Sequence, residues 1–257
     1  MNYRYFYKRA YYISVVAAGI TDSNDLKGLK VEYDYINGNQ LKPILVISRT
    51  EVNSESPQCI VNIIPSVPPN VFPPARLYPL KNCVRPQQTT PTEATDKPTY
   101  KPTPFYNASL AADTTYFPYL ALLHSSASTC AAFTNACVLG RVWLQQRGFG
   151  GLVSKGGFGH FEWAILMAFL LEGGGSKGHA LLATGYSNYQ MFKAMLQFLA
   201  ERDLVGTPLV LRTTENVKNS ASKFPAVFDG KYGVNVLFKM TPWSYDLVSF
   251  AHEPSLE

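Results

Sequence analysis

Residues 136–171 read ACVLGRVWLQQRGFGGLVSKGGFGHFEWAILMAFLL and carry the strongest structural signal in this chain. A helical segment bearing Arg141 and Arg147 ends at Gly148, and a glycine-rich, basic connection follows it. An almost wholly apolar helix then begins at Phe158. The N-terminus of a helix presents backbone N–H groups that attract anions. We therefore expect this segment to bring backbone donors and cationic side chains together, an arrangement that can hold a phosphate.

The composition indicates a folded chain and excludes several classes of protein. Of its 257 residues, 46% are hydrophobic, and the net charge of +5 is too small to indicate nucleic-acid binding by itself. The longest apolar run, residues 161–171, is far shorter than the roughly 20 residues that cross a membrane, so no membrane segment is expected. The cysteines show no metal-ligand spacing, so we expect reduced thiols and no metal site. They are Cys59, Cys83, Cys130 and Cys137.

Proline placement predicts the domain organisation. Eleven of the 18 prolines lie between Pro65 and Pro104, a density that is incompatible with a helix or a central strand. We therefore predict a first domain over residues 1–75, an extended Pro-rich connector over 76–115, and a second domain over 116–257.

The first domain reads as a helix packed on a small sheet. Apolar residues at steps of three and four predict a helix over residues 2–18. Strands are predicted at residues 29–35 and 43–48, joined by the turn dipeptide Asn37-Gly38, and a third at 58–64. Three strands and one helix leave one sheet face and one edge uncovered, so this domain looks incomplete.

The second domain is predicted to be mostly helical, which makes the chain an α+β protein. Ser187 and Gln190 form a capping-box pattern at the start of one helix, and Thr241-Pro242 has the character of a helix start. The predicted helices are 119–147, 158–171 and 188–202, with strands at 208–213, 226–228 and 234–238 and a turn near Asp229-Gly230.

Two motifs resemble the central helical domain of poly(A) polymerases and oligoadenylate synthetases. In those enzymes one helix bears Lys-x-Trp, the next opens at a Gly-x-(Asn/Ser)-Ser-aromatic turn, and the lysine and the turn serine hold the nucleoside triphosphate. Here the motifs are Arg141-x-Trp143 and Gly157-Phe158-Gly159-His160-Phe161. Arg141 stands at the lysine position and His160 at the serine position. Neither replacement is equivalent, because a guanidinium binds differently from an ammonium and an imidazole replaces a small hydroxyl.

A longer resemblance, over nearly the whole chain, is to the Nrap family of nucleolar RNA-associated proteins, which includes the large UTP-C subunit of the small-subunit processome. It rests on residues 3–10, 41–45, 140–148, 156–171 and 187–193. The resemblance implies a fragment that holds the later part of a nucleotidyltransferase-like domain and the poly(A)-polymerase-like helical domain after it.

The resemblance also allows a test of catalysis. Active relatives hold two metal ions with three carboxylates, and the resemblance puts the first two upstream of this chain and the third on a hydrophobic–Asp–hydrophobic strand. The matching strand here is Ile60–Ile64, where Asn62 takes the place of the carboxylate. A neutral amide cannot supply the charge that two Mg²⁺ ions require. We therefore predict a degenerate nucleotidyltransferase that is not an enzyme and has no metal or cofactor.

The predicted function is a non-catalytic scaffold of nucleolar pre-ribosomal particles in small-subunit rRNA processing. The resemblance implies two protein partners of the UTP-C group, an RRM-like rRNA-processing protein and casein kinase two, and the predicted role adds pre-rRNA or small nucleolar RNA as a third partner. An active template-independent RNA nucleotidyltransferase is the alternative, and a pure protein adaptor is a third reading.

Two groups of residues are candidates for RNA contact, and each has a second reading. Cations interleave with rings near the N-terminus, which either contact RNA or form the solvated face of an amphipathic helix. A second group either grips a phosphate, pairs with Glu162 or Glu172, or faces solvent, whereas Trp143 and Trp163 are expected in the core. The first group is Tyr3, Arg4, Tyr5, Lys8 and Arg9, and the second is Arg141, Arg147 and Lys155.

Overall fold

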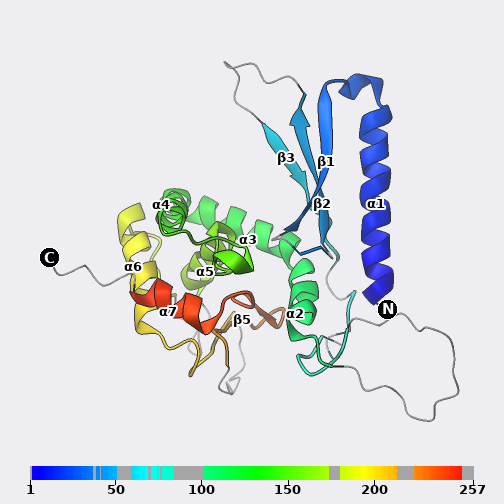
Figure 1. Cartoon of the computed structure of the whole chain (residues 1–257). Helices are drawn as coiled ribbons and strands as arrows, with labels where there is room; N and C mark the ends of the chain where they lie inside the picture. The colour runs from blue at the N-terminus through cyan, green and yellow to red at the C-terminus, as the bar shows by residue number, and fades with distance from the viewer. Residues whose placement is uncertain are drawn as a thin grey trace, which may run out of the picture. The chain divides into compact units, whose positions relative to one another are not determined.

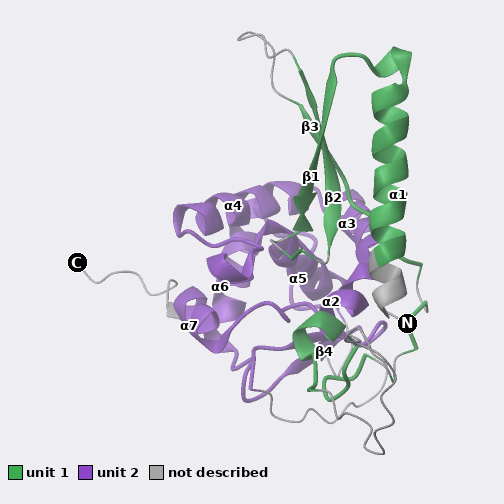
Figure 2. Cartoon of the chain, turned by 45° about the vertical axis from the view of Figure 1, so that its right-hand side comes forward, with its two compact units in different colours: residues 1–107 green, residues 108–257 purple. Residues whose placement is uncertain are grey.

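The protein is an α+β chain of two compact units, residues 1–107 and 108–257 (Figure 2). The computed structural model describes residues 2–36, 39–40, 42–50, 59–68, 71–73, 75, 77–83, 101–173, 180–212 and 223–250, with side chains from Tyr7 to Ser249. No helix within these ranges is both long enough and apolar enough to span a bilayer.

The first unit pairs one helix with a three-stranded antiparallel sheet of order β1-β2-β3 (Figure 1). The predicted helix and strands are confirmed with small changes of length. The Asn37-Gly38 turn lies outside the described residues. The elements are α1 (Asn2–Asp22), β1 (Leu29–Tyr35), β2 (Pro43–Arg49) and β3 (Ile60–Ile63).

The core of the first unit forms where α1 lies against the sheet. Ile13 and Ala17, one helical turn apart, pack on Leu45 in the central strand. Tyr33, two residues from the partly buried Val31, shares its sheet face but stays exposed. In the described part of the unit β3 pairs only with β2, so the predicted uncovered sheet edge is present there.

The last part of the predicted extended connector is instead helical, which corrects that prediction. Helix α2 spans Pro104–Asp113. A proline fits the first helical position, because the N–H it lacks would have no partner there. Asn107 donates from Nδ2 to the carbonyl oxygens of Tyr78 and Lys81, at 2.9 Å each, and so ties the preceding segment to α2.

The predicted helix over residues 119–147 is wrong, because two helices occupy this range. Helix α3 (Tyr116–Thr129) and helix α4 (Phe133–Gln146) are separated by a break at Cys130, whose backbone is extended. Hydroxyl groups in the last turn of α3 bond back to carbonyls four residues earlier, which competes with helix continuation. These bonds run from Ser128 to His124 at 2.9 Å and from Thr129 to Ser125 at 2.7 Å.

Helix α5 (His160–Glu172) is the centre of the second unit. It packs against α3 and α4, and nearly every side chain from Trp163 to Leu171 is buried. Helix α6 (Asn188–Glu201) packs on α4, and α7 (Pro242–Phe250) packs on α6. The capping box at Ser187 is confirmed, since its N–H donates to Gln190 Oε1 at 2.9 Å and its Oγ accepts from Gln190 N at 3.3 Å.

A second small sheet consists of β4 (Leu209–Leu211), β5 (Val227–Asp229) and β6 (Val234–Asn235), with β4 parallel and β6 antiparallel to β5. The strand predicted over 234–238 has only two residues. The Asn235 side chain accepts the N–H groups of Val227 and Leu237, at 3.0 Å each, and so ends the ladder.

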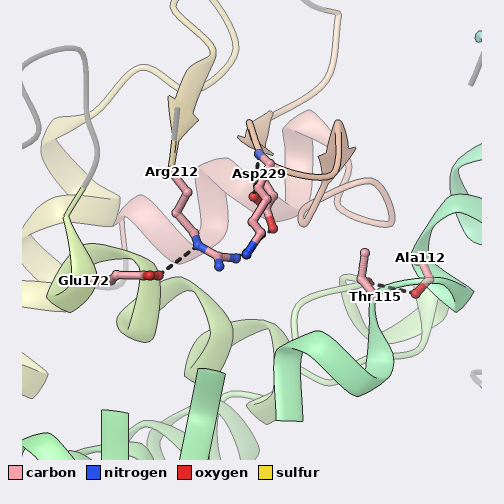
Figure 3. Close-up of polar contacts among 6 residues, drawn as sticks. Ala112, Thr115, Glu172, Arg212 and Asp229 are labelled. Atoms are coloured by element: carbon pink, nitrogen blue, oxygen red, sulfur yellow. Dashed lines mark hydrogen bonds and ion pairs between the residues drawn. The ribbon is translucent and has the colours of Figure 1, made fainter. Parts of the chain in front are cut away.

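An ionic network that is buried at Asp229 and exposed at Glu172 joins this sheet to α5 (Figure 3). Arg212 bridges the Glu172 carboxylate, 2.8 Å from its Nε, and the Asp229 carboxylate, 3.0 Å from its Nη1. Asp229 is fully buried; burial raises the pKa of this carboxyl, and the charge of Arg212 opposes that rise. Burial likewise raises the pKa of Tyr119, which lies close to Asp229, far above its usual range. Arg212 has a φ of 58°, a left-handed conformation that is uncommon for a residue with a side chain.

Candidate functional site

The glycine-rich connection between α4 and α5, residues 148–159, is called the glycine elbow here. Its fold depends on glycines with positive φ, which side-chain-bearing residues rarely adopt. The N–H of Gly150 donates to the Lys155 carbonyl at 2.8 Å and closes a loop around the 3-10 turn Val153–Lys155. The positive-φ glycines are Gly148 (75°), Gly156 (87°) and Gly157 (68°).

An aromatic cluster in the core includes Phe158 of the elbow. The rings of Trp143 and Trp163 lie 6.0 Å apart, and Phe158 lies 6.2 Å from Trp163. Gly140 permits this packing, because a Cβ at that position would lie only 2.2 Å from the Trp163 ring. The prediction that both tryptophans belong to the core is confirmed, since they are 8% and 0% exposed.

A carboxylate of the protein itself lies at the N-terminus of α5. Glu162 Oε2 accepts the N–H of Gly159 at 2.9 Å, and its Oε1 lies 2.5 Å from Lys239 Nζ. Lys239 also donates to the Gly151 carbonyl at 2.9 Å, and both charged side chains are at least nine-tenths buried. The positive end of the helix thus already has an anion, and that anion has its own counter-ion.

The predicted cations of this region remain on the surface. Glu162 pairs with Lys239 and Glu172 with Arg212, so neither carboxylate binds the cations that the sequence offered as partners. Within the described parts of the chain, Arg141, Arg147 and Lys155 are exposed and form no ion pair. The Arg147 guanidinium carbon lies 4.6 Å from the centre of the Trp143 ring, a cation–π contact that fixes its position.

The two positions that resemble triphosphate ligands are both accessible. Arg141 is exposed on α4 while Trp143 points into the core, which confirms the predicted opposite placement of these side chains. His160 is the first residue of α5 and is exposed. A nucleotide-binding origin of the two positions stays a prediction.

Asn62 is exposed on β3 in the first unit. Across the sheet it pairs with Val46, and Val46 pairs in turn with Glu32 of β1. Glu32 lies two strands away from Asn62 and forms an ion pair with Lys30 at 2.7 Å. Among the residues that the structure describes, no three His, Cys, Asp or Glu side chains form a group fit for a metal ion. The reading of Asn62 as a former metal ligand stays a prediction.

The candidate residues on α1 do not share one environment. Lys8 is exposed, whereas Arg9 is 2% exposed and its Nε donates to the Pro43 carbonyl at 3.3 Å. The predicted RNA contact by Arg9 is therefore corrected: it lies one turn before Ile13, on the side of α1 that faces the sheet. The side chains of Tyr3, Arg4 and Tyr5 lie outside the described part.

Lys239 is the site residue that the sequence reasoning missed. It lies 77 residues after Glu162, so no local pattern joins the two. A weak signal exists in the segment VNVLFKM, residues 234–240, where a single lysine interrupts an apolar run. A charged residue within an apolar run is often buried, and a buried charge is nearly always paired with an opposite one.

Comparison with known proteins agrees with this architecture. Residues 1–129 match a family model described as Nrap protein domain 1, and residues 132–257 match one described as Nrap protein PAP/OAS-like domain. Similar proteins include U3 small nucleolar RNA-associated protein 22 of Saccharomyces cerevisiae, 35% identical over 96% of this chain and 22% of the relative. Nucleolar protein 6 of Xenopus laevis is 32% identical over 100% of this chain and 22% of the relative. Nucleolar protein 6 of Homo sapiens is 33% identical over 93% of this chain and 19% of the relative.

The chain therefore spans about a fifth of the length of the curated relatives it matches. The names of these relatives place them in the nucleolus, which is the predicted location. Two consecutive domain models of one family cover the chain almost from end to end, in the order in which its two units occur. The chain belongs to the Nrap family.

Proposed function

We propose that this chain is a non-catalytic building block of pre-ribosomal particles that acts in small-subunit rRNA processing, and that its helical unit contacts RNA through the glycine elbow. The names of relatives associated with U3 small nucleolar RNA and with the nucleolus support a role in rRNA processing. One observation carries the rest: the buried Glu162–Lys239 pair already places a carboxylate at the N-terminus of α5, while Arg141, Arg147 and Lys155 stay on the surface.

The internal carboxylate argues against a working triphosphate site. A phosphate approaching the first turn of α5 would meet Glu162, whose negative charge already bonds the Gly159 N–H. Moving Glu162 away would leave Lys239 without its partner in a buried place, which is costly. The neutral Asn62 adds to this argument, because paired Mg²⁺ ions are held mainly by carboxylates.

The surface cations suit a phosphate backbone. Exposed arginine and lysine side chains bind phosphates with little desolvation cost and displace the counter-ions of the nucleic acid. Arg147 is the best prepared of the three, because its contact with Trp143 has already restricted the guanidinium. Lys8 on α1 is the proposed contact of the first unit. The RRM-like protein and casein kinase two implied by the family resemblance remain the proposed protein partners.

Binding of the 257-residue chain to a fluorescein-labelled 12-nucleotide single-stranded RNA, followed by anisotropy at several salt concentrations, tests the RNA contact. Replacing Arg141, Arg147 and Lys155 together by alanine should weaken binding and reduce the slope of log K against log salt by about 2. The matched control removes the same charge elsewhere, by replacing the exposed Lys27, Arg49 and Lys81. Equal effects of the two triple variants would refute a defined RNA surface at the elbow.

The catalytic alternative has its own assay. The full-length protein, incubated with Mg²⁺, nucleoside triphosphates and an RNA primer, should leave the primer at its original length. Primer extension that is abolished by replacing Arg141 with alanine would overturn the non-catalytic proposal.

A further inference from the structure

Helix α7 exposes a large aromatic side chain at its start. Of the three tryptophans in the chain, Trp143 and Trp163 are buried, whereas Trp243 is 71% exposed. It directly follows Pro242, the first residue of α7, and Ser244 and Tyr245 after it are buried. The indole thus stands on the solvent side of a helix whose other side is fixed in the core. An indole carries about 150–250 Å² of mainly apolar surface, so a partner that covers it gains substantially.

The start of α7 and the glycine elbow form one surface. A Cβ on Gly157 would lie 2.2 Å from the Lys239 carbonyl oxygen, and a Cβ on Gly156 would lie 3.4 Å from Ser244 Cβ. The elbow therefore packs against Lys239 with no room for a side chain at Gly157, and Gly156 lies within ordinary packing distance of Ser244. Lys155 directly precedes Gly156 and Trp243 directly precedes Ser244, so an exposed cation and an exposed indole each adjoin this contact along the chain.

We propose that Trp243 is a stacking platform for a base of single-stranded RNA, and that Lys155 neutralises the adjoining phosphate. This inference rests on the proposed RNA contact of the elbow and specifies that the RNA is single-stranded and that one of its bases stacks on Trp243. A flat ring beside a cation is the arrangement that binds unpaired bases with little sequence preference. A duplex keeps its bases stacked inside and cannot use the ring in this way.

The exposed charges of the elbow and of α7 differ in sign, which favours one direction for the RNA. Lys155 belongs to the elbow, and Arg147, at the end of α4, adds a second exposed cation where the elbow begins. Asp246, three residues after Trp243, is exposed one turn further along α7 and would repel a phosphate there. The RNA backbone therefore runs from the indole toward the elbow and not along α7.

Fluorescence tests this arrangement directly, because Trp243 is the exposed tryptophan. Titrating the 257-residue chain with a 12-nucleotide oligoadenylate should quench its emission, and Trp243→Phe should abolish most of the quenching. Trp243→Ala should raise the Kd for this RNA roughly 5- to 150-fold. Trp243→Phe, which keeps a ring, should recover most of the affinity, and Kd for a 12-base-pair duplex should not change in either variant.

Phe117→Ala is the matched control, because Phe117 is 77% exposed on α3 and belongs to no proposed contact. It should leave the Kd unchanged, and circular dichroism should show that every variant is folded. Unchanged oligoadenylate affinity in Trp243→Ala would overturn the stacking role and assign the indole to a protein partner, even if the triple cation variant still weakens binding. If the unmodified chain binds no RNA at all, the proposed function fails together with this inference.

Discussion

The Glu162 carboxylate and the Lys239 ammonium group meet at 2.5 Å in the interior of the helical unit, although 77 residues separate them in the sequence. This ion pair joins the first turn of α5 to the segment that leads into α7, and through Gly151 it also holds the glycine elbow. The elbow is therefore fixed from its inner side by a charge pair, while its outer side presents exposed cations. Stability and the proposed RNA contact can be separated by mutating one side at a time.

Breaking this pair should destabilise the helical unit. Lys239→Met leaves the Glu162 charge buried without its counter-ion, and loss of one member of a buried pair typically costs about 3–5 kcal/mol. Unfolding in guanidinium chloride, followed by the emission of the buried Trp143 and Trp163, measures the loss. Combining Lys239→Met with Glu162→Gln should recover a large part of it, because the glutamine stays neutral and still accepts the Gly159 N–H. A double variant as unstable as the sum of the two singles would contradict this account.

Gly140 should not tolerate even one methyl group. In most exposed helices alanine is more stable than glycine by up to about 1 kcal/mol. At Gly140 a Cβ would lie 2.2 Å from the rigid Trp163 ring, so Gly140→Ala should instead destabilise by about 1–3 kcal/mol. The control is Gly19→Ala in α1, where no atom lies within 4 Å of the new Cβ and helix propensity should stabilise the first unit. Thermal melts followed by circular dichroism compare the two, and effects of equal sign would refute the packing argument.

The network of Arg212 should make stability depend on pH. Burial raises the pKa of Asp229 above its unfolded value, so this group stabilises the fold below the usual carboxyl range and loses that contribution as the pH rises through its folded pKa. Arg212→Met removes the positive charge that lowers the pKa of Asp229, so the folded-state pKa of Asp229 rises further. The pH range over which Asp229 is protonated in the folded protein but ionised in the unfolded protein therefore becomes wider. The variant should therefore be about 3–5 kcal/mol less stable than the parent at pH 7 and recover part of the difference on acidification.

A second substitution shows whether Asp229 is the source of that pH dependence. Arg212→Met combined with Asp229→Asn should lose the extra pH dependence, since the buried charge is then absent. Methionine suffers the same left-handed φ as arginine, so backbone strain cancels in the comparison. Denaturant unfolding at pH 5, 6 and 7 measures all three proteins. If Arg212→Met is less stable than the parent by the same free energy at each pH, Asp229 is not the group responsible for the pH dependence.

The sequence predicted those features that depend on neighbouring residues. The capping box at Ser187, the helix start at Thr241 and the helix α1 follow local rules, and all three are present. The opposite placement of Arg141 and Trp143 also follows from helix periodicity alone. Local rules succeed because these interactions span four residues or fewer.

The errors arose where a long-range or competing contact decided the structure. Two hydroxyl groups at Ser128 and Thr129 end α3, although the apolar pattern continues beyond them. Arg9 was read as a surface cation, but the sheet buries it against β2. Lys239 could not be joined to Glu162, because pairing over such a separation depends on the completed fold. The sequence thus predicted the exposure of Arg141 and the burial of Trp143, but not the internal ion pair between Glu162 and Lys239.

Thiol chemistry gives a final test of the helical packing. Burial raises the pKa of Cys137 on α4 to about 12, so at pH 8 only about one thiol in ten thousand is the reactive thiolate. Cys130 and Cys83 are shielded by burial, whereas Cys59 is exposed. A disulfide reagent such as DTNB should therefore react rapidly with one thiol per native chain, with none in Cys59→Ser, and with all four in denaturant. Raising the pH to 9 should still leave Cys137 protonated and slow to react. A second fast thiol under native conditions that is lost in Cys137→Ser would mean that α4 separates from α5, where Cys137 Sγ lies 3.9 Å from Met167 Sδ, and would contradict the packing beneath the elbow.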